Sequence, residues 1–380
     1  MPHGIITIDE EGQIIDINTP EKDKDKHPVD FYDGVIVPGF VNAHCHLELS
    51  HLKDVIPSGK GIGNFIGRIF NKREAPEELV LEAAAIADRE MFFLGVSGVG
   101  DISNGALTAK VKKESSINYF TFIEVFGFHP DRATKAIDIA LSVKQVYDQL
   151  NLPSSIVPHA PYSVSQSLFQ KVNNLKWNDS AILSMHNQES RAENRFFRKG
   201  DGAIKDHIDK NLGIDTSCWQ PTGKNSLESV LFMLPEEKPL LLVHNTFSTL
   251  RDLRHLRKWR SPENTWLVIC ANSNLYIEKH LPPVNHFRKE GMQICLGTDS
   301  LASNHSLSPV LEMITLQQHF PDVSLQEMLT WACLNGAKAL GMDKQLGSIE
   351  VGKKPGLVFI SRIDLKSLKL TPQSRSQRVV

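Results

Sequence analysis

The sequence predicts an α/β protein built on a (β/α)8 TIM barrel. Apolar, strand-like runs alternate with helical patterns through the middle of the chain, which indicates βαβ units and a parallel sheet. Eight such strands occur over about the length that a (β/α)8 barrel occupies. Both ends of the 380-residue chain lack this alternation and consist instead of short strand-like runs and turns.

The two chain ends are predicted to be β-structure. Near the start, strand-like runs at residues 5–8 and 13–17 flank a polar turn at 9–12, a pattern typical of a hairpin. A charged, exposed loop is expected at 21–26. Near the other end, a strand-like run at 356–360 follows glycine-containing turns.

The middle of the chain supplies the barrel elements. The clearest helix lies at 77–93, where apolar residues recur at helical spacing and Pro76 suits a first turn. A doubly wound sheet is the alternative, but no glycine-rich phosphate loop supports it. The predicted strands are 41–46, 96–102, 119–126, 155–159, 181–186, 239–244, 266–270 and 293–298. The predicted helices are 77–93, 131–150, 192–209, 225–234, 308–319 and 324–340.

The composition is that of a soluble globular protein. Hydrophobic residues make up 41%, charged residues 23%, and the formal net charge is -2, so nothing indicates nucleic-acid binding. No secretory signal opens the chain, and no apolar run approaches the roughly 18 residues that span a membrane. Five scattered cysteines without C-x-x-C spacing favour a reducing cytoplasm over disulfides or a cysteine zinc site.

One short segment carries the first chemical signal. Residues 38–46 read PGFVNAHCH, an apolar run that ends in His44 and His46. In a strand, side chains two residues apart point to the same face, so the two imidazoles should lie side by side. Alone the pair is weak, because imidazole serves many other roles.

The ends of the other strands strengthen this signal. Metal-binding side chains end five of the eight predicted strands, and active sites of these barrels lie at the carboxyl ends of the strands. One such histidine is more often a core residue, but imidazole and carboxylate ligands gathered on one rim suit a divalent ion. The residues are His44, His46, His159, His186, His244 and Asp299.

Glu189 adds a candidate acid. It follows His186 by three residues, where the strand gives way to a loop or helix, so its carboxylate can lie over a metal without binding it. The competing interpretation is that Glu189 sits in the first turn of the next helix, where a negative charge is favourable. Its position after His186 favours the catalytic interpretation.

These motifs resemble the amidohydrolase superfamily, in its cytosine deaminase and chlorohydrolase-like branch. The resemblance implies a (β/α)8 barrel at 38–342 and a small composite β-sandwich domain from both termini, 1–37 and 343–380. The short N-terminus predicts that this second domain is trimmed. The matching segments are PGFVNAHCH at 38–46, HNQE at 186–189, HN at 244–245, GTDS at 297–300, NGAKALG at 335–341, GSI at 347–349 and GK at 352–353.

Three further segments resemble purine-nucleoside deaminases of the aminodeoxyfutalosine deaminase-like group. They are HCHLELS at 44–50, PHAPYSVS at 158–165 and DSLASN at 299–304. In such enzymes the strand-four histidine contacts substrate, so this role is assigned to His159, with Glu48 and Ser303 as further candidate contacts. Loop hydrogen bonding accounts for Glu48 and Ser303 equally well.

The resemblance also implies a metal site and a reaction. His44, His46, His186 and Asp299 would hold one divalent ion, with zinc expected and iron or manganese as alternatives. Binuclear relatives use a carboxylated lysine at the end of strand four, and residues 154–163 contain no lysine, so one ion is predicted.

Hydrolytic deamination follows from the same set. Asp299 would take a proton from the metal-activated water, and Glu189 would protonate the ring nitrogen beside the carbon under attack. His244 would stabilise the tetrahedral intermediate before ammonia leaves. The predicted substrate is an aminopurine nucleoside or related amino-heterocycle.

Two other functions stay open at this point. A chlorohydrolase or cyclic-amide hydrolase would use the same fold, and a non-catalytic metal-binding barrel is the alternative of another class. Glu189 and His244 argue against the latter, since a structural zinc site closes its fourth position and needs no acid. The sequence leaves open whether residues 272–275 line the pocket, whether Trp219 and residues 191–198 form a lid, and whether the protein is a homo-oligomer.

Overall fold

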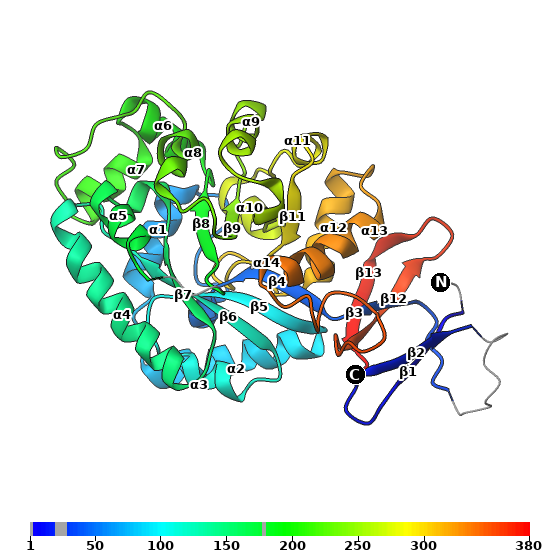
Figure 1. The fold of residues 1–380 in the computed structure, drawn as a ribbon. Coiled ribbons are helices and arrows are strands. Elements are labelled where there is room, and N and C mark those ends of the chain that lie inside the picture. Colours follow the sequence, from blue (N-terminus) through cyan, green and yellow to red (C-terminus); the bar gives the residue numbers. More distant parts are fainter. Residues whose placement is uncertain (1–2, 20–28, 177–179) are drawn as a thin grey trace.

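The computed structural model describes residues 3–19, 29–176 and 180–380, and the predicted loop at 21–26 lies outside these ranges. Eight parallel strands form the centre of the fold, each close to where the sequence predicts it (Figure 1). Their apolar composition explains this, because all eight strands are almost completely buried. They are β4 (Phe40–Cys45), β5 (Val96–Ser103), β6 (Asn118–Val125), β7 (Ser154–Pro158), β8 (Leu183–Asn187), β9 (Leu240–His244), β10 (Thr265–Ile269) and β11 (Gln293–Leu296).

The strands form two halves that meet at two seams. β4 to β7 pair in sequence order, as do β8 to β11. At one seam the backbone N–H of His186 donates to the carbonyl of His159 (2.9 Å). At the other, the N–H of Thr298 donates to the carbonyl of His44 (3.0 Å). These bonds join the halves into a barrel, and the predicted fold class is confirmed.

The helices follow the strands along the chain and include several that the sequence pattern did not reveal. α2 has the predicted bounds, and α1, α3, α5, α9, α10 and α11 were not predicted. The helices are α1 (Ile62–Lys72), α2 (Glu77–Phe93), α3 (Ala109–Glu114), α4 (Ala133–Gln149), α5 (Gln166–Asn173), α6 (Arg191–Lys199), α7 (Ala203–Asp206), α8 (Ser226–Val230), α9 (Leu250–Trp259), α10 (Ala271–Glu278), α11 (Val284–Lys289), α12 (Pro309–His319), α13 (Leu325–Thr330) and α14 (Gly336–Ala339). Shorter 3₁₀ turns include Leu47–Leu52 and Pro161–Ser163.

Two predicted helices are interrupted. The helix expected at 192–209 breaks after α6, because Gly200 and Gly202 take positive φ values of 72° and 96°. Glycine adopts such angles without steric cost, and a left-handed residue ends an α-helix. The chain continues through α7 into a π-helical turn, His207–Asn211. The helix expected at 324–340 contains a second π-helical turn, Trp331–Asn335, between α13 and α14.

The chain ends form two small sheets beside the barrel (Figure 1). β1 (Ile5–Ile8) and β2 (Ile14–Asn18) make the predicted hairpin, and β3 (Val35–Pro38) pairs with β12 (Leu357–Asp364), which pairs with β13 (Lys369–Arg378). The hairpin is tied to the C-terminal region where the N–H of Ile14 donates to the carbonyl of Lys353 (2.9 Å). The division into domains at 37/38 and 342/343 stays a prediction.

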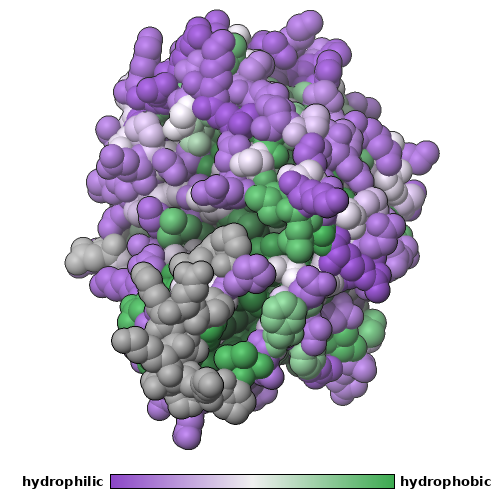
Figure 2. Space-filling model, turned by 90° about the vertical axis from the view of Figure 1, so that its right-hand side faces the viewer, coloured by the Kyte–Doolittle hydropathy of each residue, from purple (hydrophilic) through white to green (hydrophobic). Residues whose placement is uncertain are grey.

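The surface near these small sheets carries several exposed apolar side chains. Phe31 is 82% exposed and Val351 62%, and Leu365 and Leu368 on the β12–β13 turn are also exposed. Figure 2 shows hydrophobic surface on this face of the molecule.

Among the described residues, no helix combines the length and apolar character that crossing a bilayer requires.

Candidate active site

The predicted metal ligands converge at the carboxyl end of the barrel strands. His44 lies on β4 and His46 directly after it, His186 lies on β8, and Asp299 lies in the loop after β11. The Nε2 atom of His46 lies 3.2 Å from Nε2 of His44 and 3.2 Å from Nε2 of His186. Asp299 Oδ1 lies 3.5 Å from Nε2 of His46 and 3.9 Å from Nε2 of His44. The structure therefore gathers the four predicted ligand side chains around one point.

The chemistry of this cluster fits a cation. Burial is the main cause that lowers the pKa values of His44 and His46, and the neighbouring histidines lower that of His44 further. The Nε2 atoms of the neutral His44 and His46 rings approach to 3.2 Å and turn lone pairs toward each other, an arrangement that a shared divalent ion satisfies. The residues present thus suit a metal with nitrogen and oxygen ligands.

Asp299 is held firmly as a carboxylate. Its Oδ2 accepts hydrogen bonds from the hydroxyls of Ser273 (2.6 Å) and Ser303 (2.8 Å), and its Oδ1 accepts the N–H of Ser300 (2.7 Å). Burial would raise the pKa of Asp299, but the nearby rings of His46 and His244 and the Ser273 hydrogen bond lower it overall. Oδ1 stays directed toward the histidine cluster.

Glu189 and His244 lie together beside the cluster. Glu189 Oε1 is 3.7 Å from His244 Nε2, and both side chains are buried. Burial raises the pKa of Glu189 to about 8, although His186 opposes the shift. His244 Nδ1 accepts from the Asn274 amide (3.1 Å), which leaves the proton of the neutral ring on Nε2, facing the site. Burial thus favours the protonated form of Glu189, and the His244 ring directs an N–H toward the site.

The backbone that carries these groups takes left-handed angles. φ is 47° at Gln188, 72° at His244, 54° at Asn245 and 58° at Asp299. Such angles are uncommon for residues other than glycine and cluster at functional sites. They turn the chain sharply where three barrel strands end, which directs the side chains inward.

The three candidate substrate contacts are placed differently. His159 is partly buried, its ring lies 4.8 Å from that of His186, and it faces the exposed ring of Phe126 at 4.6 Å. Glu48 pairs with Arg73 (3.2 Å), and Ser303 is fully buried against Asp299. Contact with substrate stays a prediction for all three, and for Ser303 the structure shows a second role, which is to hold Asp299.

Several supporting residues were missed from the sequence. Glu124, near the end of β6, lies 3.2 Å from His186 Nδ1. Burial alone would lower the pKa of His186, but the Glu124 hydrogen bond raises it to about 9. Ser273 and Asn274, within the segment left open between pocket and turn, form the start of α10 and contact Asp299 and His244. Glu193 accepts the backbone N–H groups of Gln188 (2.9 Å) and Glu189 (3.2 Å).

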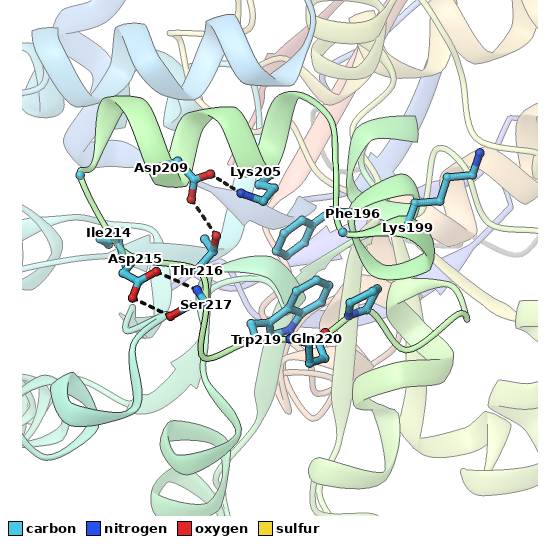
Figure 3. Close-up of a pocket in the computed structure, with 13 residues that line it drawn as sticks. Phe196, Lys199, Lys205, Asp209, Ile214, Asp215, Thr216, Ser217, Trp219 and Gln220 are labelled. Carbon is cyan, nitrogen blue, oxygen red and sulfur yellow. Dashed lines mark hydrogen bonds and ion pairs between the residues drawn. The ribbon is translucent and has the colours of Figure 1, made fainter.

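A separate cavity of about 850 Å³ lies between α6, α7 and the loop at 213–221 (Figure 3). The Trp219 ring stacks on that of Phe196 at 4.0 Å, so Trp219 and the 191–198 segment pack against each other, and whether they act as a lid stays open. Lys205 and Asp209 line the opposite wall, where they pair with each other. None of the predicted metal or catalytic residues lines this cavity.

Known proteins resemble this chain over most of its length. An adenosine deaminase of Helicobacter pylori is 28% identical over 331 residues, which cover 86% of this chain and 79% of the relative. A 5-methylthioadenosine/S-adenosylhomocysteine deaminase of Syntrophus aciditrophicus is 26% identical over 360 residues, which cover 90% of this chain and 74% of the relative.

Solved structures share the fold. The H. pylori aminofutalosine deaminase in complex with methylthio-coformycin matches with a TM-score of 0.80 at 23% identity, covering 100% of this chain and 96% of that one. An adenosine deaminase of Xanthomonas campestris with bound zinc matches with a TM-score of 0.74 at 22% identity, covering 98% and 82%. The profile of the amidohydrolase family matches residues 35–376, and the chain belongs to this family.

Proposed function

We propose that this protein is a metal-dependent deaminase that removes the amino group of an adenosine-like nucleoside by hydrolysis. The observation that carries the proposal is the pairing of Glu189 with His244 next to the ligand cluster. Relatives that are 26–28% identical over most of the chain are deaminases of adenosine, methylthioadenosine and S-adenosylhomocysteine. The aminofutalosine deaminase fold match supports the finer expectation of an aminodeoxyfutalosine-like substrate.

The residues divide the proton transfers between them. Glu189, whose pKa is raised to about 8, donates its proton to the ring nitrogen next to the amino-bearing carbon. Protonation of that nitrogen makes the carbon open to attack by water. Asp299, ionised and held by Ser273, accepts a proton from the attacking water. His244 Nε2–H donates to the oxygen on the tetrahedral carbon. Asp299 then passes the proton that it took from water to the amino group, the C–N bond breaks and ammonia leaves. The hydroxyl proton on the carbon returns to Glu189, which leaves a carbonyl in the product.

His44, His46, His186 and Asp299 are the residues that would hold the metal. When bound, a divalent ion lowers the pKa of a coordinated water to near neutrality. Zinc is the proposed ion, since a zinc-bound adenosine deaminase shares the fold, and the residues that end β7 supply no lysine to bridge a second ion. Elemental analysis of the purified protein should find one zinc per chain, and two would rule out the single-ion site.

The cysteines support a proposed location in the cytoplasm. All five cysteines are free, and Cys218 is exposed, which suits a reducing cytoplasm. A homo-oligomer remains part of the proposal, and light scattering of the purified protein tests it.

Ammonia release tests the proposed reaction. Zinc-loaded protein is given adenosine, 5′-methylthioadenosine, S-adenosylhomocysteine and aminodeoxyfutalosine, with guanine and cytosine as unrelated amino-heterocycles. We expect ammonia from at least one of the four adenine nucleosides and a faster rate there than with guanine or cytosine. Zinc-loaded protein that releases no ammonia from any of them would contradict the proposal. Chloride release from a chlorotriazine under the same conditions would favour the chlorohydrolase alternative.

A further inference from the structure

Glu124 on β6 is buried directly behind the proposed metal centre. It is 7% exposed, and its Oε1 lies 3.2 Å from Nδ1 of His186. That nitrogen is also 2.9 Å from the backbone carbonyl oxygen of His159. Two oxygen acceptors therefore face the side of the His186 ring that points away from His44 and His46.

Acceptors at Nδ1 fix the proton of the imidazole. An imidazole that binds a metal through Nε2 carries a single proton on Nδ1, and an acceptor next to Nδ1 keeps it there. The Nε2 lone pair then faces Nε2 of His46, 3.2 Å away, where the ligand cluster lies. Carboxylates in this relation to a metal-binding histidine orient the ring and make it a stronger ligand.

A chain of polar contacts holds Glu124 in place. Its Oε2 accepts from the side-chain amide of Asn104 (3.0 Å), and the carbonyl oxygen of that side chain accepts from Arg73 (2.7 Å). The backbone N–H of Asn104 donates to Glu48 Oε2 (3.0 Å), and Glu48 Oε1 lies 3.2 Å from Arg73. Both oxygens of Glu48 are therefore engaged by the protein itself.

The same carboxylate lies close to His159. Ligand-type atoms of Glu124, His159 and His186 all lie within 4.8 Å of one another. Glu124 thus stands between a proposed metal ligand and a candidate substrate contact. Its charge is close enough to act on both rings.

We infer that Glu124 is a positioning residue, which holds His186 in the orientation and tautomer that bind the metal, while Asn104, Arg73 and Glu48 hold Glu124. The inference rests on the proposed metal centre. Glu124 itself contacts neither the metal nor the reacting atoms. A carboxylate that serves only the packing of the barrel is the competing account, and it predicts no effect on metal affinity.

Zinc affinity tests the inference without turnover. Glu124→Gln keeps the size of the side chain but cannot accept from both Asn104 and His186 in the same way. We expect its zinc dissociation constant, measured by competition with a chromophoric chelator, to rise roughly 10- to 100-fold. The matched control is Asp252→Asn, because Asp252 is also fully buried and accepts from Asn225 and Thr249 without contact to a metal ligand. Its zinc affinity should match that of the unchanged protein.

A second variant covers the case in which Glu124→Gln does not fold. Asn104→Ala leaves Glu124 and His186 in place and removes one donor to the carboxylate, so zinc affinity should fall severalfold. Visible absorption of the cobalt-loaded protein should also change in shape, because it reports the ligand geometry of the ion. Folded Glu124→Gln or Asn104→Ala protein with unchanged zinc affinity and an unchanged cobalt spectrum would overturn the inference. Failure of the unchanged protein to bind zinc would instead overturn the proposed function.

Discussion

The two halves of the barrel hold their site residues in different ways. In the half from β8 to β11, the backbone is left-handed at Gln188, His244, Asn245 and Asp299. In the half from β4 to β7, no described residue at a strand's carboxyl end takes a positive φ. In this half, buried side chains fix the position of the site residues. Lys112 pairs with Asp101 at 2.6 Å, and Asp101 accepts the N–H of Leu47 (2.8 Å), which directly follows His46.

The two halves also differ in the roles proposed for their residues. The second half carries Glu189, His244 and Asp299, the groups proposed to move protons, and each left-handed residue there stores on the order of 1–3 kcal/mol of strain. The first half carries the proposed ligands His44 and His46 and the candidate substrate contacts Glu48 and His159. None of these residues takes a positive φ. Loss of a proton-moving side chain in the second half should therefore change turnover, and loss of the Lys112–Asp101 pair should lower the stability of the first half.

The largest expected effect is the loss of the acid in the second half. Glu189→Gln cannot donate a proton to the ring nitrogen, so kcat should fall by roughly 10² to 10⁴. Zinc content should not change, because Glu189 is not a proposed ligand. Steady-state kinetics and elemental analysis measure the two quantities. Glu228→Gln, which removes a carboxylate that pairs with Arg251 on a different helix, serves as the control with normal activity. A fully active Glu189→Gln protein would refute the assignment of the acid.

The next effect concerns the first half and its buried ion pair. Burial would lower the pKa of Lys112, but Asp101 and Tyr147 raise it overall, so the amine is charged. Lys112→Met leaves the Asp101 charge unpaired, and breaking such a pair costs about 3–5 kcal/mol of unfolding free energy. Urea denaturation measures this loss. Lys144→Met, which breaks a partly exposed pair with Asp148, should cost much less. Equal losses of unfolding free energy in both variants would show that the buried Lys112–Asp101 pair does not stabilise the first half more than a surface pair does.

The smallest of the three effects is a pH dependence from the second half. Glu189 must be protonated to act, and burial raises its pKa to about 8. At lower pH the acid is present, and as pH rises through 8 it ionises, so kcat/KM should fall about tenfold per pH unit above this value. A pH–rate profile with a stable substrate measures the alkaline limb. If kcat/KM stays constant up to pH 10, the activity does not depend on protonated Glu189.

Most of the barrel could be predicted because its strands are apolar throughout. Even the clustering of His44, His186 and Asp299 followed from their places at strand ends. The break between α6 and α7 was missed because the helical pattern continues across Gly200 and Gly202, whose backbone angles the pattern does not contain. The predicted site lacked Glu124 because its partner, His186, lies two strands away around the barrel.

Side-chain direction set another limit on what could be predicted. Ser303 follows Asp299 by four residues, so a place near the site was predictable. Whether its hydroxyl faces the substrate or Asp299 depends on the local turn, and the structure shows it donating to Asp299 Oδ2. Asn274 likewise contacts His244 because the start of α10 lies beside the end of β9, a proximity that the sequence pattern does not contain.

The pairing of β3 with β12 has a consequence for synthesis of the chain. Val35 to Pro38 directly precede β4, yet their hydrogen-bonded neighbours, Leu357 to Ile360, come after the whole barrel in the chain. Contacts between residues so far apart in sequence form slowly, because a long loop must close first. On the ribosome, β3 therefore stays unpaired until β12 emerges, and this small sheet forms only after the strands of the barrel have been made.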